Sequence, residues 1–237
     1  MSVSQQAYPG AAQQLQRNLL LPYVVYRGKW LRVDRSGIEL RKVLSPNLEL
    51  DLGFSASLGS NSEEIEARRG MAELGTLVEV GPRIRWTLNQ TESSRLRATV
   101  GLRTVLDASA QLRDKGLVLE PQLVYERRSE GGLLWSASAG LLFGDERLAD
   151  TFYGVAPRYQ TAQRASYEAL GGLITSRFSL YASKAMTPDL RIAGGVRSDT
   201  VDGAANQSSP LVRQNSGATF GVWLTYTLAR SGVLVRE

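Results

Sequence analysis

Apolar side chains occupy alternate positions near the end of the chain, over residues 217–229. One face of this segment carries Phe220, Val222, Leu224, Tyr226 and Leu228. The other face carries Thr219, Gly221, Thr225 and Thr227, with Trp223 as the exception. Because successive side chains of a strand point to opposite faces, this segment is predicted to be a β-strand with one apolar and one polar face.

The same alternation recurs along most of the chain and predicts an all-β fold of about twelve strands. The clearest strands are 47–58, 76–88, 95–107, 117–127, 133–144, 188–199 and 217–229, and the less clear ones are 22–34, 37–44, 152–159, 166–174 and 177–184. Helices would place apolar residues three and four positions apart, and these segments do not. Gly28 interrupts the alternation of its segment, which predicts a β-bulge there.

Two classes of connection alternate along the predicted strands. Short turns are expected at 45–46, 89–94, 128–132, 160–165 and 184–187. The second class has longer or more polar links at 59–75, 108–116, 145–151 and 199–216, and tight links at Arg35-Ser36 and Thr175-Ser176. Outer-membrane barrels have short periplasmic turns and longer outer loops. The pattern therefore predicts a closed antiparallel transmembrane β-barrel with both termini on the short-turn side.

Composition excludes several other classes of protein. No apolar run approaches the ~20 residues of a transmembrane helix, which excludes a helical inner-membrane protein. The net charge of +5 comes from scattered basic residues rather than from one basic face, so it does not indicate nucleic-acid binding. The first ten residues contain no secretory signal. Because an outer-membrane protein needs one, we expect a processed chain or a truncated start.

Aromatic residues on the apolar face form two predicted belts. The first, near the short turns, contains Trp86, Tyr125, Trp135 and Tyr226, and the second, toward the other end, contains Phe54, Phe143 and Phe220. Membrane interfaces favour such belts, so the apolar face is predicted to contact lipid. Between the belts, Leu102 and Ala139 are predicted to face lipid, and Arg97 and Ser138 to face the lumen.

Charged residues gather on the polar face of neighbouring strands. The predicted lumen cluster consists of Arg83, Arg85, Arg95, Arg97, Arg103, Glu49, Asp51, Glu79, Glu120 and Glu126. Such a cluster can line an anion-favouring pore, or it can fill a narrow barrel with ion pairs. Limited room inside about twelve strands favours the ion-pair interpretation.

Catalytic chemistry has little support in the composition. The chain lacks His and Cys, so neither a Ser-His or Cys-His nucleophile nor a thiolate or imidazole metal site can be built. Paired carboxylates remain, such as Glu120 with Glu126, but lumen ion pairs explain them better than glycoside hydrolysis does. We therefore predict no enzymatic activity, no cofactor and no metal site.

The chain resembles the MipA/OmpV family of outer-membrane barrels. The resemblance rests on an ordered set of short segments: Tyr8-Pro9-Gly10, Leu21-Pro22-Tyr23, Tyr26-Arg27-Gly28, Gly81-Pro82, Phe152-Tyr153-Gly154-Val155, Tyr167, Gly171-Gly172 and Ser208-Ser209-Pro210-Leu211-Val212. It implies a scaffolding protein of the Gram-negative cell envelope. Outer-membrane lipid and murein hydrolases or synthases on the periplasmic side are its implied partners.

The organisation expected is one barrel domain over residues 1–237, with an N-terminal segment 1–20 and a C-terminal extension 230–237. Two alternatives to scaffolding stay open from the residues alone. One is a narrow, weakly anion-selective outer-membrane pore. The other is a soluble, ligand-binding barrel of the lipocalin type, suggested by the missing signal.

Overall fold

The computed structural model describes residues 1–20, 26–27, 31–34, 37–57 and 59–229. These residues form thirteen strands, one α-helix and four 3-10 helices. The strands are β1 (Ser2–Gln6), β2 (Gln14–Asn18), β3 (Tyr26–Arg27), β4 (Leu31–Asp34), β5 (Gly37–Ser45), β6 (Leu48–Ser57), β7 (Leu77–Gln90), β8 (Ser94–Asp107), β9 (Arg113–Arg128), β10 (Leu134–Gly144), β11 (Gly172–Ala185), β12 (Leu190–Thr200) and β13 (Ser216–Tyr226). The helices are η1 (Ser62–Glu64), η2 (Glu66–Arg68), η3 (Ala108–Ala110), α1 (Glu146–Tyr153) and η4 (Pro157–Tyr159).

All described strands belong to one antiparallel sheet, which confirms the predicted all-β class. The order follows the chain from β3 to β13 and then continues with β1 and β2. Val3 in β1 lies opposite Gly221 in β13, so the start of the chain pairs with its last strand. In the described part of the chain, β2 and β3 stand at the two ends of this order.

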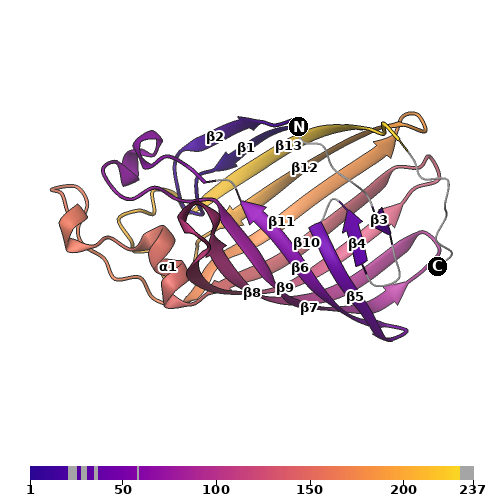
Figure 1. Cartoon of the computed structure of the whole chain (residues 1–237), viewed down its shortest axis with the longest axis horizontal. Coiled ribbons are helices and arrows are strands. Elements are labelled where there is room, and N and C mark those ends of the chain that lie inside the picture. Colours follow the sequence, from indigo (N-terminus) through magenta and orange to yellow (C-terminus); the bar gives the residue numbers. More distant parts are fainter. Residues whose placement is uncertain (21–25, 28–30, 35–36, 58, 230–237) are drawn as a thin grey trace.

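The connections follow the predicted alternation in length except between β8 and β9, where β9 begins at Arg113 and the predicted long link 108–116 is reduced to residues 108–112. Short turns join β5 to β6, β7 to β8, β9 to β10 and β11 to β12. Longer links join β6 to β7 and β12 to β13, and the link from β10 to β11 includes α1 and η4. Figure 1 shows the sheet strongly curled, with α1 and the long connections gathered at one end.

Four sequence predictions between residues 145 and 185 are wrong. The segment 152–159 is not a strand, because it contains the end of α1 and η4. The segment 166–174 is extended only from Gly172, and β11 runs through the predicted link Thr175-Ser176. The expected short turn 160–165 lies within the long β10–β11 connection.

Local chemistry explains why α1 forms where a polar link was expected. The Asp145 carboxylate accepts a hydrogen bond from the Leu148 backbone N–H at 2.9 Å, which is the usual N-cap arrangement. Leu148 and Phe152 lie four positions apart and both pack against the sheet. This helical spacing spans the border between two segments that were read as a link and a strand.

Two predictions near the N-terminus also need correction. Residues 1–20, expected to be a segment outside the strands, contain β1 and β2. Residues 22–34 are not a single strand, because β3 and β4 pair antiparallel with each other. The expected bulge at Gly28 and the link Arg35-Ser36 lie outside the described residues.

The two faces of the sheet differ in exposure as well as polarity. Many large apolar side chains on one face are between 40% and 62% exposed, and we call this the outer face. Its exposed members include Ile84, Trp86, Leu88, Val100, Leu102, Leu117, Leu119, Leu123, Leu141, Phe178, Leu180, Ile192, Phe220, Val222, Leu224 and Tyr226. The opposite, inner face carries the ion pairs and receives α1. The apolar residues therefore do not form the interior of the curled sheet.

A charged inner face beneath a packed cap as the candidate functional site

Asp51 is the most deeply buried carboxylate of the inner face. It lies in β6, its side chain is fully buried, and its two oxygens each lie 3.1 Å from a guanidinium Nε, one of Arg83 and one of Arg85. Both arginines are on β7, next to β6, at alternate positions of the same face. The alternating pattern thus brings one buried acid between two bases.

A longer chain of ion pairs crosses the inner face closer to the long connections. Arg103 donates to Glu79 at 2.7 Å and to Glu120 at 2.6 Å. Arg177 continues the chain, from Glu120 at 3.0 Å to Asp199 at 2.8 Å. Arg197 contacts the other oxygen of Asp199 at 2.7 Å. Five strands, β7, β8, β9, β11 and β12, are therefore joined by alternating charges.

The remaining charged residues named from the sequence lie toward the short turns. Arg97 pairs with Glu126 at 2.7 Å between β8 and β9. Arg95 stands opposite Glu126 in the register of the same two strands. Glu49 stands opposite Arg85 between β6 and β7. The ten residues thus fall into three neighbouring groups rather than one cluster.

Sequence reasoning missed Arg177, Arg197 and Asp199 as members of this network. Arg197 and Asp199 do occupy polar positions of the predicted strand 188–199, so the signal was present. The position of Arg177 was obscured because β11 had been divided at Thr175-Ser176. Once β11 is continuous, Arg177 stands directly opposite Asp199.

Above the ion pairs, the long connections pack into a cap with its own apolar core. This cap comprises residues 7–13, 59–75, 145–171 and 201–215. Its buried core contains Tyr8, Ala11, Ile65, Ala67, Leu74, Ala149, Tyr153, Val155 and Leu211, together with Ile174 from the start of β11. Because residues from four separate segments share one core, these connections form one packed body rather than independent loops.

Helix α1 connects the cap to the inner face. Leu148 is 3% exposed and packs with Leu77, Val105 and Val118, which are buried residues of β7, β8 and β9. Val105 stands opposite Glu79, and Val118 stands opposite Arg103, so this apolar layer adjoins the ion-pair chain. The cap therefore covers the charged layer at the end with the long connections.

Two buried arginines tie the cap segments together. Arg68 donates to the carbonyl oxygens of Thr151 and Phe152 at the end of α1, at 3.3 and 3.2 Å. A guanidinium at this place also complements the negative end of the helix dipole. Arg164 donates to the carbonyls of Ala67 at 2.9 Å and of Tyr159 at 2.8 and 2.9 Å. Each arginine thus links segments that are far apart in the sequence.

Two buried tyrosines also cross-link the cap. The Tyr8 hydroxyl donates to the Leu211 carbonyl at 2.8 Å, and the Tyr153 hydroxyl donates to the Pro9 carbonyl at 3.1 Å. Burial raises the pKa of Tyr8 to about 12, although the charges of Arg68 and other nearby arginines lower it. Burial also raises the pKa of Tyr153 and lowers that of the Arg68 guanidinium.

Alkaline pH is expected to destabilise the protein through Tyr8. Its folded-state pKa of about 12 exceeds the ordinary value of 10.0. The stabilisation is therefore complete below pH 10 and is lost as the pH rises from 10 to about 12, because the unfolded chain ionises first. Denaturant titrations between pH 9 and 12 measure this loss, which Tyr8→Phe should reduce. An identical pH dependence in wild type and Tyr8→Phe would contradict this assignment.

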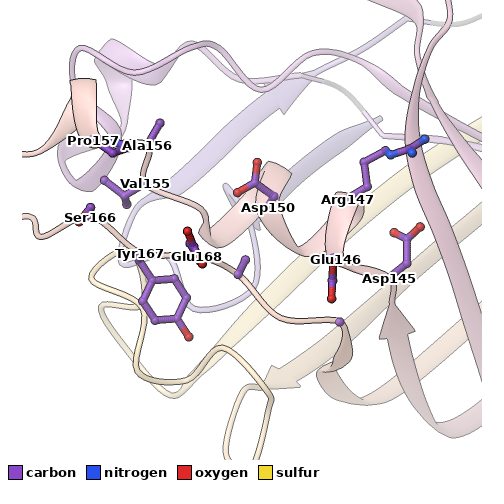
Figure 2. A pocket seen from close by; sticks show the side chains of 12 residues that line it. Asp145, Glu146, Arg147, Asp150, Val155, Ala156, Pro157, Ser166, Tyr167 and Glu168 are labelled. Atoms are coloured by element: carbon purple, nitrogen blue, oxygen red, sulfur yellow. The ribbon is translucent and has the colours of Figure 1, made fainter.

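The cap contains a pocket of about 1120 Å³ between α1 and residues 166–171. Figure 2 shows Glu146 and Asp150 on α1, and Tyr167 and Glu168 on the opposing segment. Arg147 also lines the pocket, and its guanidinium pairs with Asp114. Among the described residues, no group of three acidic, His or Cys side chains is arranged to hold a metal ion.

A family model described as MltA-interacting protein MipA matches residues 1–228. The chain belongs to the MipA family. No curated protein matches the chain in a sequence search. The match confirms the resemblance that was stated from the short sequence segments.

Several of those MipA-like segments meet in the cap. The Gly10 carbonyl accepts hydrogen bonds from the Arg213 and Gln214 backbone N–H groups at 2.8 and 3.2 Å. Gly10 has a φ of +89°, which favours glycine.

The later segments join the same core. Val155 pairs with Tyr167 through a β-bridge, and Ser209 donates to the Tyr153 carbonyl at 2.7 Å. Segments that carry the family resemblance therefore build one structural unit from distant parts of the MipA-type chain.

The aromatic residues predicted as interface belts lie on the outer face. Tyr125 and Trp135 contact each other, with ring centroids 5.4 Å apart. Trp86, Phe220 and Tyr226 are exposed, and Phe54 and Phe143 are half-buried. The exception noted in β13, Trp223, lies on the inner face and stacks on Tyr181 at 5.6 Å. No helix in the described ranges is long and apolar enough to span a membrane.

Proposed function

We propose that this MipA-family chain is an outer-membrane β-barrel that scaffolds murein enzymes from its periplasmic side. The observation that carries the membrane assignment is the outer face, where large apolar side chains are exposed while charged side chains are paired on the inner face. Water would disfavour such a continuous apolar surface, whereas lipid favours it. This arrangement also argues against a lipocalin-type barrel, whose apolar face points inward.

Barrel closure is part of this proposal. A sheet that crosses a membrane cannot leave edge strands unpaired, because lipid offers no hydrogen bonds. The pairing of β1 with β13 already brings the two ends of the chain together. Closure then requires the β2 edge to meet the β3 edge. Because the thirteen described strands pair antiparallel in succession, β2 and β3 run in the same direction, and this contact differs from the even-numbered antiparallel closure expected from the sequence.

A cysteine pair is expected to link β1 to β13 in the folded protein. Ser4 stands opposite Phe220 and Ser2 stands opposite Val222, and the chain has no native cysteine. Opposed residues have Cβ atoms about 4.5–5.5 Å apart, within reach of a disulfide or a short bismaleimide. Ser4→Cys with Phe220→Cys should cross-link in vesicles, as seen by altered gel migration.

A mismatched pair provides the control for this cross-link. Ser4→Cys combined with Leu224→Cys is displaced by four residues along β13 and should stay unlinked. If both pairs react equally, or if neither reacts in folded protein, the β1–β13 register and the proposed closure are wrong.

The scaffolding role is supported by the family name, which describes an MltA-interacting protein. Under the proposed orientation, the short turns face the periplasm and the cap faces outward. Partners on the periplasmic side would then meet the short turns. Arg127 and Arg128 are exposed at the end of β9, beside one of these turns, and offer a basic contact surface.

Charge reversal at this turn is expected to weaken partner binding. Arg127→Glu with Arg128→Glu should reduce capture of a purified MltA-type murein enzyme by about ten-fold, because interfacial charges are sensitive to reversal. Arg158→Glu, an exposed substitution in the cap, is the matched control and should have no effect. Surface plasmon resonance with the full chain in detergent measures both. Loss of binding only in the cap variant would show that the cap, rather than the short turns, meets the partner, and the proposed orientation would be wrong.

The cap and the ion pairs also bear on the pore alternative. Among the described residues, a layer of buried apolar side chains lies above a chain of ion pairs and fills part of the inner face. We therefore expect no steady conductance in planar bilayers. A stable current in wild type that changes in Arg97→Ala would instead support a pore.

A further inference from the structure

The outer face contains a groove of about 620 Å³ that crosses strands β8 to β12. Two rows of side chains flank it. Adjacent residues in the first row stand opposite each other in the strand register, and the row consists of Ala98, Leu123, Ala139, Phe178 and Ser198. The second row lies two residues further along each strand.

Members of the second row are Val100, Pro121, Leu141, Ser176 and Thr200. The register pairs Val100 with Pro121 and Ser176 with both Leu141 and Thr200. Across five strands the groove is about 19 Å long, at about 4.8 Å between strands, and its rows are about 6.8 Å apart along each strand. This length is comparable to one leaflet of a hydrocarbon core that is ~30 Å thick.

We propose that this groove binds the acyl chain of a membrane lipid. This inference rests on the proposed membrane function. Among the described residues that line the groove, Arg177 is the only charged one. Arg177 borders it, but its guanidinium is on the inner face, bonded to Glu120 and Asp199. The lining is therefore suited to a hydrocarbon chain.

The groove is apolar along most of its length and hydroxylated at one end. Ser176, Ser198 and Thr200 lie together on β11 and β12, where β12 ends at a long connection. Thr200 donates to the Asn215 carbonyl at 3.1 Å, which places this end beside the 201–215 segment of the cap. An amphiphile with its chain along the groove would place its polar head at these hydroxyls, in the leaflet nearest the cap.

A second copy of the chain fits this groove less well than a lipid does. Two-fold related copies present the same patch to each other. Groove would then face groove, and neither would be filled. A flexible acyl chain can fill a concave surface, because it does not have to present a matching patch.

Filling the groove with a side chain is expected to abolish the lipid site. Ala139 is exposed in the middle of the first row, and leucine there would occupy the groove. Ala137→Leu is the matched control, because Ala137 lies two residues away on the same face of β10 and does not line the groove. Both variants add the same apolar group to a surface that already contacts lipid, so folding should be preserved.

Native mass spectrometry of the delipidated full chain in detergent, titrated with dipalmitoyl phosphatidylethanolamine, tests the site. We expect one lipid to bind at least ten-fold more tightly than any further lipid in wild type and Ala137→Leu, and Ala139→Leu to lose this preference. Ser176→Ala with Ser198→Ala should weaken the first binding about five-fold or more if a hydroxyl bonds the head group.

Insertion of the same proteins into phosphatidylcholine vesicles separates the two proposals. If wild type inserts but binds every lipid with equal affinity, or if Ala139→Leu binds like Ala137→Leu, the lipid site is wrong and the barrel stands. If wild type does not insert, the proposed membrane function fails. A dimer that forms in wild type and is lost only in Ala139→Leu would identify a second copy as the occupant and would overturn the lipid site.

Discussion

Asp51→Ala is expected to lower the free energy of unfolding by about 3–5 kcal/mol, because it removes a buried carboxylate that contacts two guanidinium groups. Asp51 is 2% exposed and lies between the Nε atoms of Arg83 and Arg85. Removing the carboxylate leaves their positive charges close together in a shielded environment. Urea titrations of the protein folded into lipid vesicles measure the change.

A partly exposed ion pair on the same face provides the control for Asp51. The Glu126 side chain is 34% exposed and pairs with Arg97 at 2.7 Å. Glu126→Ala should cost about 1 kcal/mol or less, because solvent can replace the lost partner. Equal costs for the two substitutions would show that Asp51 is not in a shielded interior, and the assignment of the inner face would then fail.

Leu102→Arg is expected to destabilise the membrane-inserted protein by about 2–4 kcal/mol, the cost of an arginine on the lipid face near the midplane of a barrel. Leu102 is 46% exposed on the outer face of β8. Ser138→Arg places the same side chain on the inner face of β10, next to Gln122, whose amide donates to the Ser138 hydroxyl at 3.1 Å. The inner-face arginine should therefore cost much less.

Changing the surroundings of the protein offers an independent check on this pair of substitutions. In water or detergent alone, the free-energy penalty of Leu102→Arg should shrink, because the arginine no longer faces an extended hydrocarbon layer. The effect of Ser138→Arg should change little. A larger penalty at Ser138 than at Leu102 in vesicles would show that the two faces are exchanged.

The inner face and the cap differ in how far the sequence alone predicts them. The charged residues of the inner face follow directly from strand alternation, since side chains at alternate positions share a face. Asp51, Arg83 and Arg85 could be grouped in this way from neighbouring strands. The approximate positions of β6 to β10, β12 and β13 followed from the same local pattern.

The cap could not be predicted in this way, because its core joins residues that are far apart along the chain. Tyr8 contacts Leu211, and Arg164 contacts Ala67, across separate connections. Nothing in the local pattern near Tyr8 indicates that its hydroxyl will reach residue 211. The ordered segments shared with the MipA family marked these places, but their mutual contact appears only in the folded chain.

Strand alternation in this sequence thus determined the all-β class, the two faces and the side on which the charges lie, because these depend on a period of two residues. Tertiary structure decided that α1 forms where a polar link was expected, that β1 pairs with β13 and that Arg177 joins the ion-pair chain. Each of these depends on contacts between distant segments. Leu148 gains burial against β7, β8 and β9 only when those strands are assembled, and this burial stabilises a helix where the sequence pattern indicated a polar link.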